Sequence, residues 1–269
     1  MKKLSLAVCV WLFIPLLAGA TLMPQDLRCE YAVNPAGIDS PHPRLFWTLA
    51  SRQPNQRQTA YEILAASSEK LLGRDQGDLW DSGRVESDKS AAVEYAGKPL
   101  PPATRFWWKV RVWDQTGKPG SFSAPNYFDT GLNQDEWTAR CIWDGTDKAN
   151  HFVYFRKSFV ITNEPASARI YVTAANDYLL YCNGQLLGQG PARCDPYHYG
   201  QYNAYDITKL VKPGTNVFAA IGHKAIPWSG NINLKPAFLL EARLLYPDGS
   251  SLKIGTDESW KVPSHTAFI

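Results

Sequence analysis

The sequence predicts an all-β protein made of two tandem β-sandwiches, and three observations lead to this prediction. Short apolar segments recur along the chain between clusters of Gly, Pro, Asn and Asp, which is typical of sandwich strands joined by turns. The clearest segment, residues 106–113 (FWWKVRVW), alternates between two faces with a period of two residues. After the first 20 residues, no long segment follows the 3.6-residue period of a helix.

The composition is that of a folded, near-neutral protein. Hydrophobic residues make up 45% and charged residues 20% of the chain, which excludes wholesale disorder. The 28 Lys and Arg residues against 25 Asp and Glu include Lys2 and Lys3 at the start of the chain. The remainder therefore has no basic excess of the kind that holds nucleic acid or an anionic membrane surface.

Residues 1–20 are predicted to be a secretory signal peptide. The basic pair Lys2-Lys3 precedes an apolar run over 4–17, and Ala18-Gly19-Ala20 is a small-residue cleavage site. An uncleaved membrane anchor is the alternative, although Pro15 interrupts the apolar run. No later segment approaches the roughly 18 consecutive apolar residues of a membrane helix, so a secreted or periplasmic product without a membrane segment is expected.

Residues 21–131 are expected to form the first sandwich, with a size of about 100 residues. In segment 106–113, Phe106, Trp108, Val110 and Val112 share the face that should be buried. Residues 114–117 (DQTG) form a turn after that segment. Trp47, Trp80 and Trp108 are expected in the core, and the other predicted strands are 44–49, 60–66 and 127–130.

Residues 132–269 are expected to form the second sandwich, after a linker at 133–137. Asn183-Gly184 is the preferred dipeptide of a type I′ turn and should join 178–182 to 185–187 in a hairpin. Residues 206–210 are predicted to be a short helical or turn piece, and 246–249 (YPDG) a second hairpin turn. The remaining predicted strands are 151–160, 168–173, 216–221, 238–245 and 251–254.

Four cysteines remain after the leader: Cys29, Cys141, Cys182 and Cys194. An oxidising compartment permits disulfides, and Cys182 with Cys194 is the candidate pair. The alternative is that some of these cysteines are buried free thiols that pack as small hydrophobic groups. Because no CxxC pair is present, no metal site is predicted.

Several motifs carry a resemblance to a known family. The chain resembles the N-terminal region of bacterial α-L-rhamnosidases, the inverting glycoside hydrolases that have an (α/α)6 barrel. The matching motifs run in the family's order over nearly the whole chain after the leader. They lie at 34–39 (NPAGID), 43–47, 58–65, 77–85, 107–114, 155–159, 168–173, 181–184, 205–208, 214–216 and 256–261.

The resemblance implies a fibronectin-III/Ig-like sandwich followed by a galactose-binding-like jelly roll. The family's hydrolytic acids lie in the barrel, and no string of this sequence matches the barrel motif. The chain is therefore expected to be non-catalytic and not to hydrolyse rhamnosides alone. The implied partners are a rhamnose-containing glycan and a catalytic (α/α)6 barrel domain.

Sugar binding is the function that the resemblance favours, and its candidate residues lie in predicted loops. Pyranose rings stack their C–H faces on aromatic rings, and their hydroxyls pair with Asn, Asp and Arg side chains. Trp228 is the first candidate, because the family commonly carries an aromatic residue beside glycine in that loop. Arg193, Asn176 and Asp177 follow it. The alternative is a purely structural or adaptor pair of sandwiches whose aromatic residues dock another protein domain.

No cofactor and no catalytic residue are predicted. The sequence has no GxSxG, HExxH or phosphate-binding GxxxxGK[ST] motif. Asp177 or Asp206 with backbone carbonyls could supply oxygen ligands to Ca²⁺, but the sequence contains no calcium-binding loop.

Overall fold

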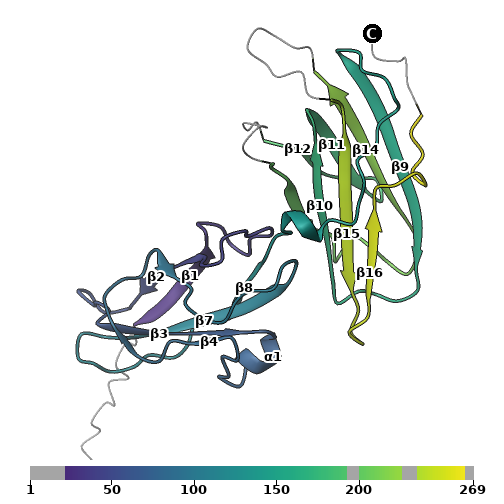
Figure 1. Ribbon diagram of the computed structural model, residues 1–269. Coiled ribbons are helices and arrows are strands. Elements are labelled where there is room, and N and C mark those ends of the chain that lie inside the picture. Colours follow the sequence, from purple (N-terminus) through teal and green to yellow (C-terminus); the bar gives the residue numbers. More distant parts are fainter. Residues whose placement is uncertain (1–21, 193–199, 226–234, 264–269) are drawn as a thin grey trace, which may run out of the picture.

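The computed structural model describes residues 22–192, 200–225 and 235–263, and it confirms the all-β prediction of two tandem sandwiches. The two sandwiches form an L-shaped molecule and meet at its corner (Figure 1). The predicted signal peptide, residues 1–20, lies outside the described residues. Within the described ranges, no helix has the length and apolar character that crossing a membrane would require.

The first sandwich consists of a three-stranded and a five-stranded sheet. The smaller sheet has the order β1-β2-β6, formed by Met23–Cys29, Arg44–Ala50 and Val93–Glu94. The larger has the order β4-β3-β7-β8, with β5 also paired to β3. Its strands are β3 (Ala60–Ala66), β4 (Trp80–Asp81), β5 (Val85–Glu86), β7 (Arg105–Trp113) and β8 (Asn126–Asp129), and a short helix, α1 (Glu69–Leu72), follows β3.

The core of the first sandwich follows the alternation in β7. Phe106, Trp108, Val110 and Val112 all point inward and are buried, as the period-two pattern predicts. Trp47 packs into the same core, whereas Trp80 is only partly buried at its margin. Burial of these large side chains is the main term that holds a sandwich of this size together.

The second sandwich consists of two four-stranded sheets. The order β13-β10-β15-β16 joins Asn203–Asp206, Ser167–Ala174, Phe238–Leu245 and Ser251–Gly255. The order β12-β11-β14-β9 joins Gln185–Gly190, Asp177–Cys182, Gly214–Lys224 and His151–Ile161. Asn183 and Gly184 both have positive φ, so the predicted type I′ turn between β11 and β12 is confirmed.

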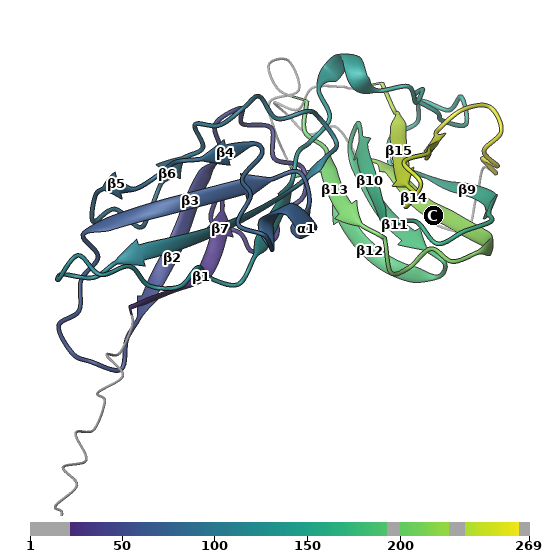
Figure 2. The same cartoon turned by 90° about the horizontal axis from the view of Figure 1, so that it is seen from below.

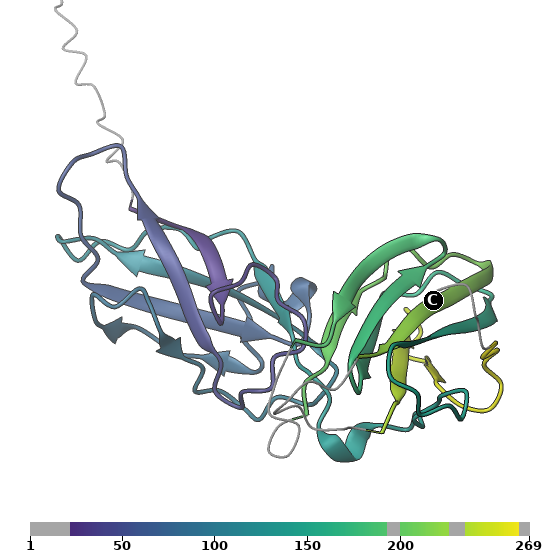
Figure 3. The same cartoon turned by 90° about the horizontal axis from the view of Figure 1, so that it is seen from above.

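The first lobe meets the second at its β13-β10 side (Figures 2 and 3). Asp129, at the end of β8, pairs there with Arg169 of β10. The connecting segment contains a 3-10 helix, η1 (Gln134–Glu136), and then runs along β15 and β16, where Arg140 donates to the carbonyl of Thr256. The segment covers part of the outer face of this sheet and buries Glu241, whereas Asp129 of the first sandwich lies against the buried Arg169.

We predict that Trp108→Ala lowers the free energy of unfolding by about 3–5 kcal/mol, because it empties a fully buried site in the first core. Urea unfolding would measure the change. Val160→Ala, at a side chain that is 66% exposed, serves as the control and should shift stability by less than about 0.5 kcal/mol. A loss below about 1 kcal/mol for Trp108→Ala would contradict this account of the core.

Candidate functional site

The structure places two of the four predicted sugar contacts. Trp228 and Arg193 lie outside the described residues. Asn176 lies in the bend before β11, and Asp177 is the first residue of that strand. The surroundings of Asp177 therefore define the candidate site.

Strand register brings three side chains together at this end of the second sandwich. Asp177 of β11 pairs with His223 of β14, and His223 pairs with Phe152 of β9. Since directly paired residues project from the same face of a sheet, the three side chains form a row across its outer face. The side chain of Asp177 remains 65% exposed, so its carboxylate is open to solvent at one end of the row.

The imidazole of His223 is held on several sides. It stacks on the ring of Phe152 with ring centroids 4.2 Å apart. Its Nδ1 lies 3.7 Å from an Asp177 carboxylate oxygen, and its Nε2 lies 3.2 Å from the amide oxygen of Asn150. We call Asn150, Phe152, Asp177 and His223 the Asp177 end; it combines a carboxylate, an amide and an imidazole with an aromatic ring.

Contacts of the loop over residues 143–150 hold the Asp177 end in place. Asp144 lies 2.6 Å from His151 Nε2 and accepts the backbone N–H of Thr146. Burial would raise the pKa of Asp144, but the bonds from His151 and Thr146 bring it below its usual value. The buried Lys224 pairs with Asp147 of the same loop, so this loop is tied to the ends of both β9 and β14.

Packing of Trp143 completes this support. Its ring contacts Phe155, with centroids 5.7 Å apart, and lies against the backbone of Gly222. A Cβ at position 222 would approach both Phe155 and Trp143 within 3.0 Å, so only glycine allows this close approach. In the ranges that the structure describes, no group of three His, Cys, Asp or Glu side chains is arranged to hold a metal ion.

The predicted Cys182–Cys194 bridge is wrong for Cys182, which is a buried free thiol in the core. Cys194 lies outside the described residues. The alternative of a buried free thiol that packs as a small hydrophobic group holds for Cys182. Burial raises the pKa of the Cys182 thiol to about 11.

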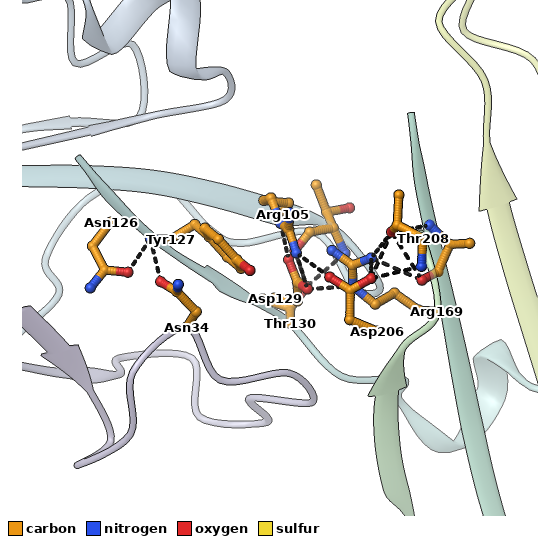
Figure 4. Close-up of polar contacts among 11 residues, drawn as sticks. Asn34, Arg105, Asn126, Tyr127, Asp129, Thr130, Arg169, Asp206 and Thr208 are labelled. Atoms are coloured by element: carbon orange, nitrogen blue, oxygen red, sulfur yellow. Dashed lines mark hydrogen bonds and ion pairs between the residues drawn. The ribbon is translucent and has the colours of Figure 1, made fainter. Parts of the chain in front are cut away.

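A second polar cluster joins the two sandwiches, and sequence reasoning did not identify it. Asp129 ends β8 in the first sandwich, is buried, and accepts a hydrogen bond of 2.8 Å from Arg105 Nε. It also pairs with Arg169, a buried residue of β10 in the second sandwich (Figure 4). Asp206, at the end of β13, lies 3.0 Å from each of the same two arginines. We call Arg105, Asp129, Arg169 and Asp206 the junction cluster.

The junction cluster is electrically balanced and internally satisfied. Two guanidinium groups alternate with two carboxylates, so no net charge is buried. The guanidinium of Arg105 also lies 3.6 Å from the ring centroid of Tyr127. Thr208 bonds both Asp206 and Arg169 through its hydroxyl. The charged groups of the cluster bond to one another and to Thr208, and these contacts indicate a structural role for the cluster.

The interdomain segment is fixed by a second buried carboxylate. Glu241 of β15 is fully buried, and one of its oxygens accepts the backbone N–H groups of Thr138 and Ala139 at 2.6 and 3.0 Å. Its other oxygen accepts from Arg243 Nε at 2.8 Å. The hydroxyl of Tyr202 bonds the backbone of Leu132 just before this segment, and a Cβ at Gly131 would overlap that hydroxyl.

The electrostatic environment favours the charged forms of these carboxylates. Burial would raise the pKa of Asp206, but the Thr208 hydrogen bonds and the charge of Arg169 bring it below its usual value. Burial opposes ionisation of Glu241 in the same way, and the bonds from Thr138 and Arg243 bring its pKa below the usual value. Both groups therefore stay ionised where they link the lobes.

Comparisons with known proteins assign both regions of the chain. Residues 24–134 match the family described as "Rha78A-like, N-terminal immunoglobulin domain", and residues 163–268 match "Alpha-L-rhamnosidase N-terminal domain". An α-L-rhamnosidase of Streptomyces avermitilis is 32% identical over 260 residues, which cover 88% of this chain and 24% of that relative. The chain spans about a quarter of the length of the curated relatives that it matches.

Solved structures give the same result. The α-L-rhamnosidase from Dictyoglumus thermophilum has a TM-score of 0.76 and 30% identity, covering 90% of this chain and 30% of that chain. The native enzyme from Aspergillus terreus has a TM-score of 0.76 and 26% identity, covering 90% of this chain and 29% of that chain.

We predict that Arg169→Leu lowers the free energy of unfolding by about 3 kcal/mol, because it leaves the buried Asp129 with one cation in place of two. Arg140→Leu removes the exposed pair with Glu258, whose side chains are 78% and 83% exposed, and should change stability by less than about 1 kcal/mol. Urea unfolding compares them. Equal losses for the two variants would contradict a special role for the junction.

We also predict that stability falls in acid. The folded pKa values of Asp206 and Glu241 lie below their unfolded values, so the unfolded chain binds more protons. The stabilisation is therefore present above about pH 4 and is lost as the pH falls through the folded values. Urea unfolding at pH 7 and pH 3 should show a smaller pH effect in Glu241→Gln than in the natural protein. The same pH effect in both proteins would refute this assignment.

Proposed function

The chain belongs to the α-L-rhamnosidase family as its N-terminal region, and from this premise we propose that it binds rhamnose-containing glycans and positions them for a catalytic domain. The binding role falls to the second sandwich, and the positioning role to the junction between the two. Export to the periplasm or the medium, on the evidence of residues 1–20, belongs to the same proposal.

The observation that carries this proposal is the composition of the Asp177 end. A neutral sugar offers hydroxyl groups, which need donors and acceptors, and apolar C–H faces, which need an aromatic neighbour. Asp177 and Asn150 supply oxygen acceptors, and His223 supplies ring nitrogens. The exposed carboxylate sits at the edge of the sandwich, where loops carried by a rigid scaffold commonly bind ligands. Asn176 beside it, together with Trp228 and Arg193, completes the proposed set of contacts.

A rigid support makes such contacts effective. The hydrogen-bond contact of Asp144 with His151 and the ion pair of Asp147 with Lys224 fix the loop that carries Asn150. Groups that are already held in place lose little conformational entropy when a ligand binds. A larger share of the free energy of each weak contact therefore remains as binding free energy.

Docking of the catalytic domain is a second candidate role, and one observation favours it. The outer face of the sheet β12-β11-β14-β9 carries a group of apolar side chains beyond the Asp177 end, and the polar side chains beside them include Arg156 and Ser158 of β9 and Gln189 of β12. The side chains that form this face include Leu179, Tyr181, Leu186, Val217 and Ile221. The Streptomyces avermitilis relative is about four times longer than this chain, and we propose that a domain in its additional length covers this face.

We predict that L-rhamnose at millimolar concentration gives binding heat with the 269-residue protein, and that Asp177→Ala weakens the affinity about tenfold or more. The reason is loss of a charged acceptor, whose hydrogen bonds are worth about 1.5–3 kcal/mol. Isothermal titration calorimetry with and without Ca²⁺ measures this effect. Trp228→Ala should weaken binding as well, through loss of the aromatic face.

The matched control is Asp248→Ala, at an exposed aspartate in the turn between β15 and β16. It should bind as the natural protein does. Two results would refute sugar binding at the Asp177 end and leave docking as the function. One is the absence of binding heat with the natural protein and its variants. The other is an equal loss of affinity in Asp248→Ala and Asp177→Ala.

A further inference from the structure

A strained turn at the end of β1 displays an aromatic side chain to solvent. Cys29 and Ala32 exchange two backbone hydrogen bonds of 3.0 Å, and the central residues Glu30 and Tyr31 have φ of 46° and 68°. Such a turn normally carries Asn-Gly, because side chains disfavour this left-handed conformation. Two non-glycine residues in succession therefore need a compensating interaction, and unusual backbone of this kind clusters at functional sites.

The compensating interaction is the pairing of Glu30 with Arg44 of β2. The carboxylate of Glu30 accepts the backbone N–H of Arg44 at 2.6 Å and its Nη2 at 2.6 Å. The same arginine donates from Nη1 to the hydroxyl of Tyr31 at 3.2 Å, and its guanidinium carbon lies 4.9 Å from the tyrosine ring centroid. Tyr31 is thus held in a defined orientation by a neighbour that the turn itself anchors.

This orientation does not serve the core. Tyr31 is 59% exposed, and so is Val33, which follows two residues later. The only ring beside it among the described residues is that of Phe46, a half-buried residue of β2, with centroids 4.5 Å apart. We call Glu30, Tyr31, Val33, Arg44 and Phe46 the Tyr31 patch. It lies outside the hydrophobic core cluster of the first sandwich.

The chemistry of the Tyr31 patch fits an uncharged ligand that has both hydroxyls and apolar faces. Glu30 and Arg44 neutralise each other within the patch. Arg28, which donates to the Tyr31 carbonyl, and Glu94, which is paired in register with Arg44, carry opposite charges beside it, so no net charge attracts an ionic partner. Tyr31 and Val33 offer apolar surface, and the tyrosine hydroxyl and the Arg44 guanidinium offer hydrogen bonds at its margin. Rigid tyrosines of this kind lose little entropy when they contact a partner.

We propose that the Tyr31 patch is a second glycan-contact surface, on the first sandwich, which takes a neutral rhamnose-containing chain. The ligand class rests on the proposed function, whereas the location does not depend on the Asp177 end. A glycan long enough to reach both surfaces engages them together, and binding of long chains then exceeds that of the free monosaccharide.

The test separates binding from folding by using Tyr31→Gly. Glycine relieves the strain of a positive φ, so the urea midpoint of this variant should not fall, whereas the aromatic contact is lost. Affinity electrophoresis in gels containing an α-linked rhamnan should show binding about fivefold to tenfold weaker. Tyr31→Phe, which keeps the ring, should retain most of the binding. Val160→Ala, an exposed apolar side chain on the other sandwich, and dextran gels serve as controls.

The outcomes distinguish this inference from the proposed function. Weaker rhamnan binding in Tyr31→Gly, with unchanged heat on titration of L-rhamnose, supports a second surface. Unchanged rhamnan binding in Tyr31→Gly, with loss in Asp177→Ala, overturns the inference, leaves the proposed function standing and assigns Tyr31 to contact with a protein. Loss in Tyr31→Gly with no effect of Asp177→Ala supports the inference and overturns the Asp177 end. A lower urea midpoint in Tyr31→Gly overturns the inference, since it shows a structural role.

Discussion

The buried contact between Asp129 and Arg169 is the constraint on which the arrangement of the two sandwiches depends. A carboxylate removed from water is tolerated only where cations and hydrogen-bond donors replace that water. Asp129 has one such cation in its own sandwich, Arg105, and the other in the next one, Arg169. Moving the lobes apart would break this pair and expose both charged groups to water. The junction therefore behaves as part of the fold, in contrast to an ordinary polar linker between domains.

This constraint gives the proposed binding surfaces a fixed spatial relation. The Asp177 end lies on the second sandwich and the Tyr31 patch on the first, and the junction cluster and the buried Glu241 hold the two sandwiches together. Two weak sites on a rigid body act on one long ligand with a high effective concentration, whereas a flexible linker would spread them over many separations. A rigid junction thus allows weak individual contacts on the two sandwiches to position one long ligand together.

Much of the fold could be predicted from the sequence because its strands obey local rules. Strand β7 follows strict alternation, and Asn183-Gly184 has the backbone freedom that its turn demands. Strand β1 was missed because Pro24 and a positive φ at Asp26 interrupt its pattern, and its register shifts there. The junction was missed for a different reason. Arg169 occupies an outward position of β10, where the strand pattern alone predicts a solvent-exposed side chain. Its partner Asp129 lies 40 residues earlier, in the other sandwich. The free thiol of Cys182 could not be predicted, because the spacing of two cysteines along a chain does not show whether their side chains meet.

The most direct test of a rigid junction is the alignment of the two sandwiches in solution. Residual dipolar couplings of backbone amides in the 269-residue protein report the orientation of each sandwich separately. If the junction cluster locks the lobes together, one alignment tensor fits the couplings of both, at low and at high salt, because the Asp129–Arg169 pair is buried. Two tensors of clearly different magnitude would show independent motion and would contradict the account.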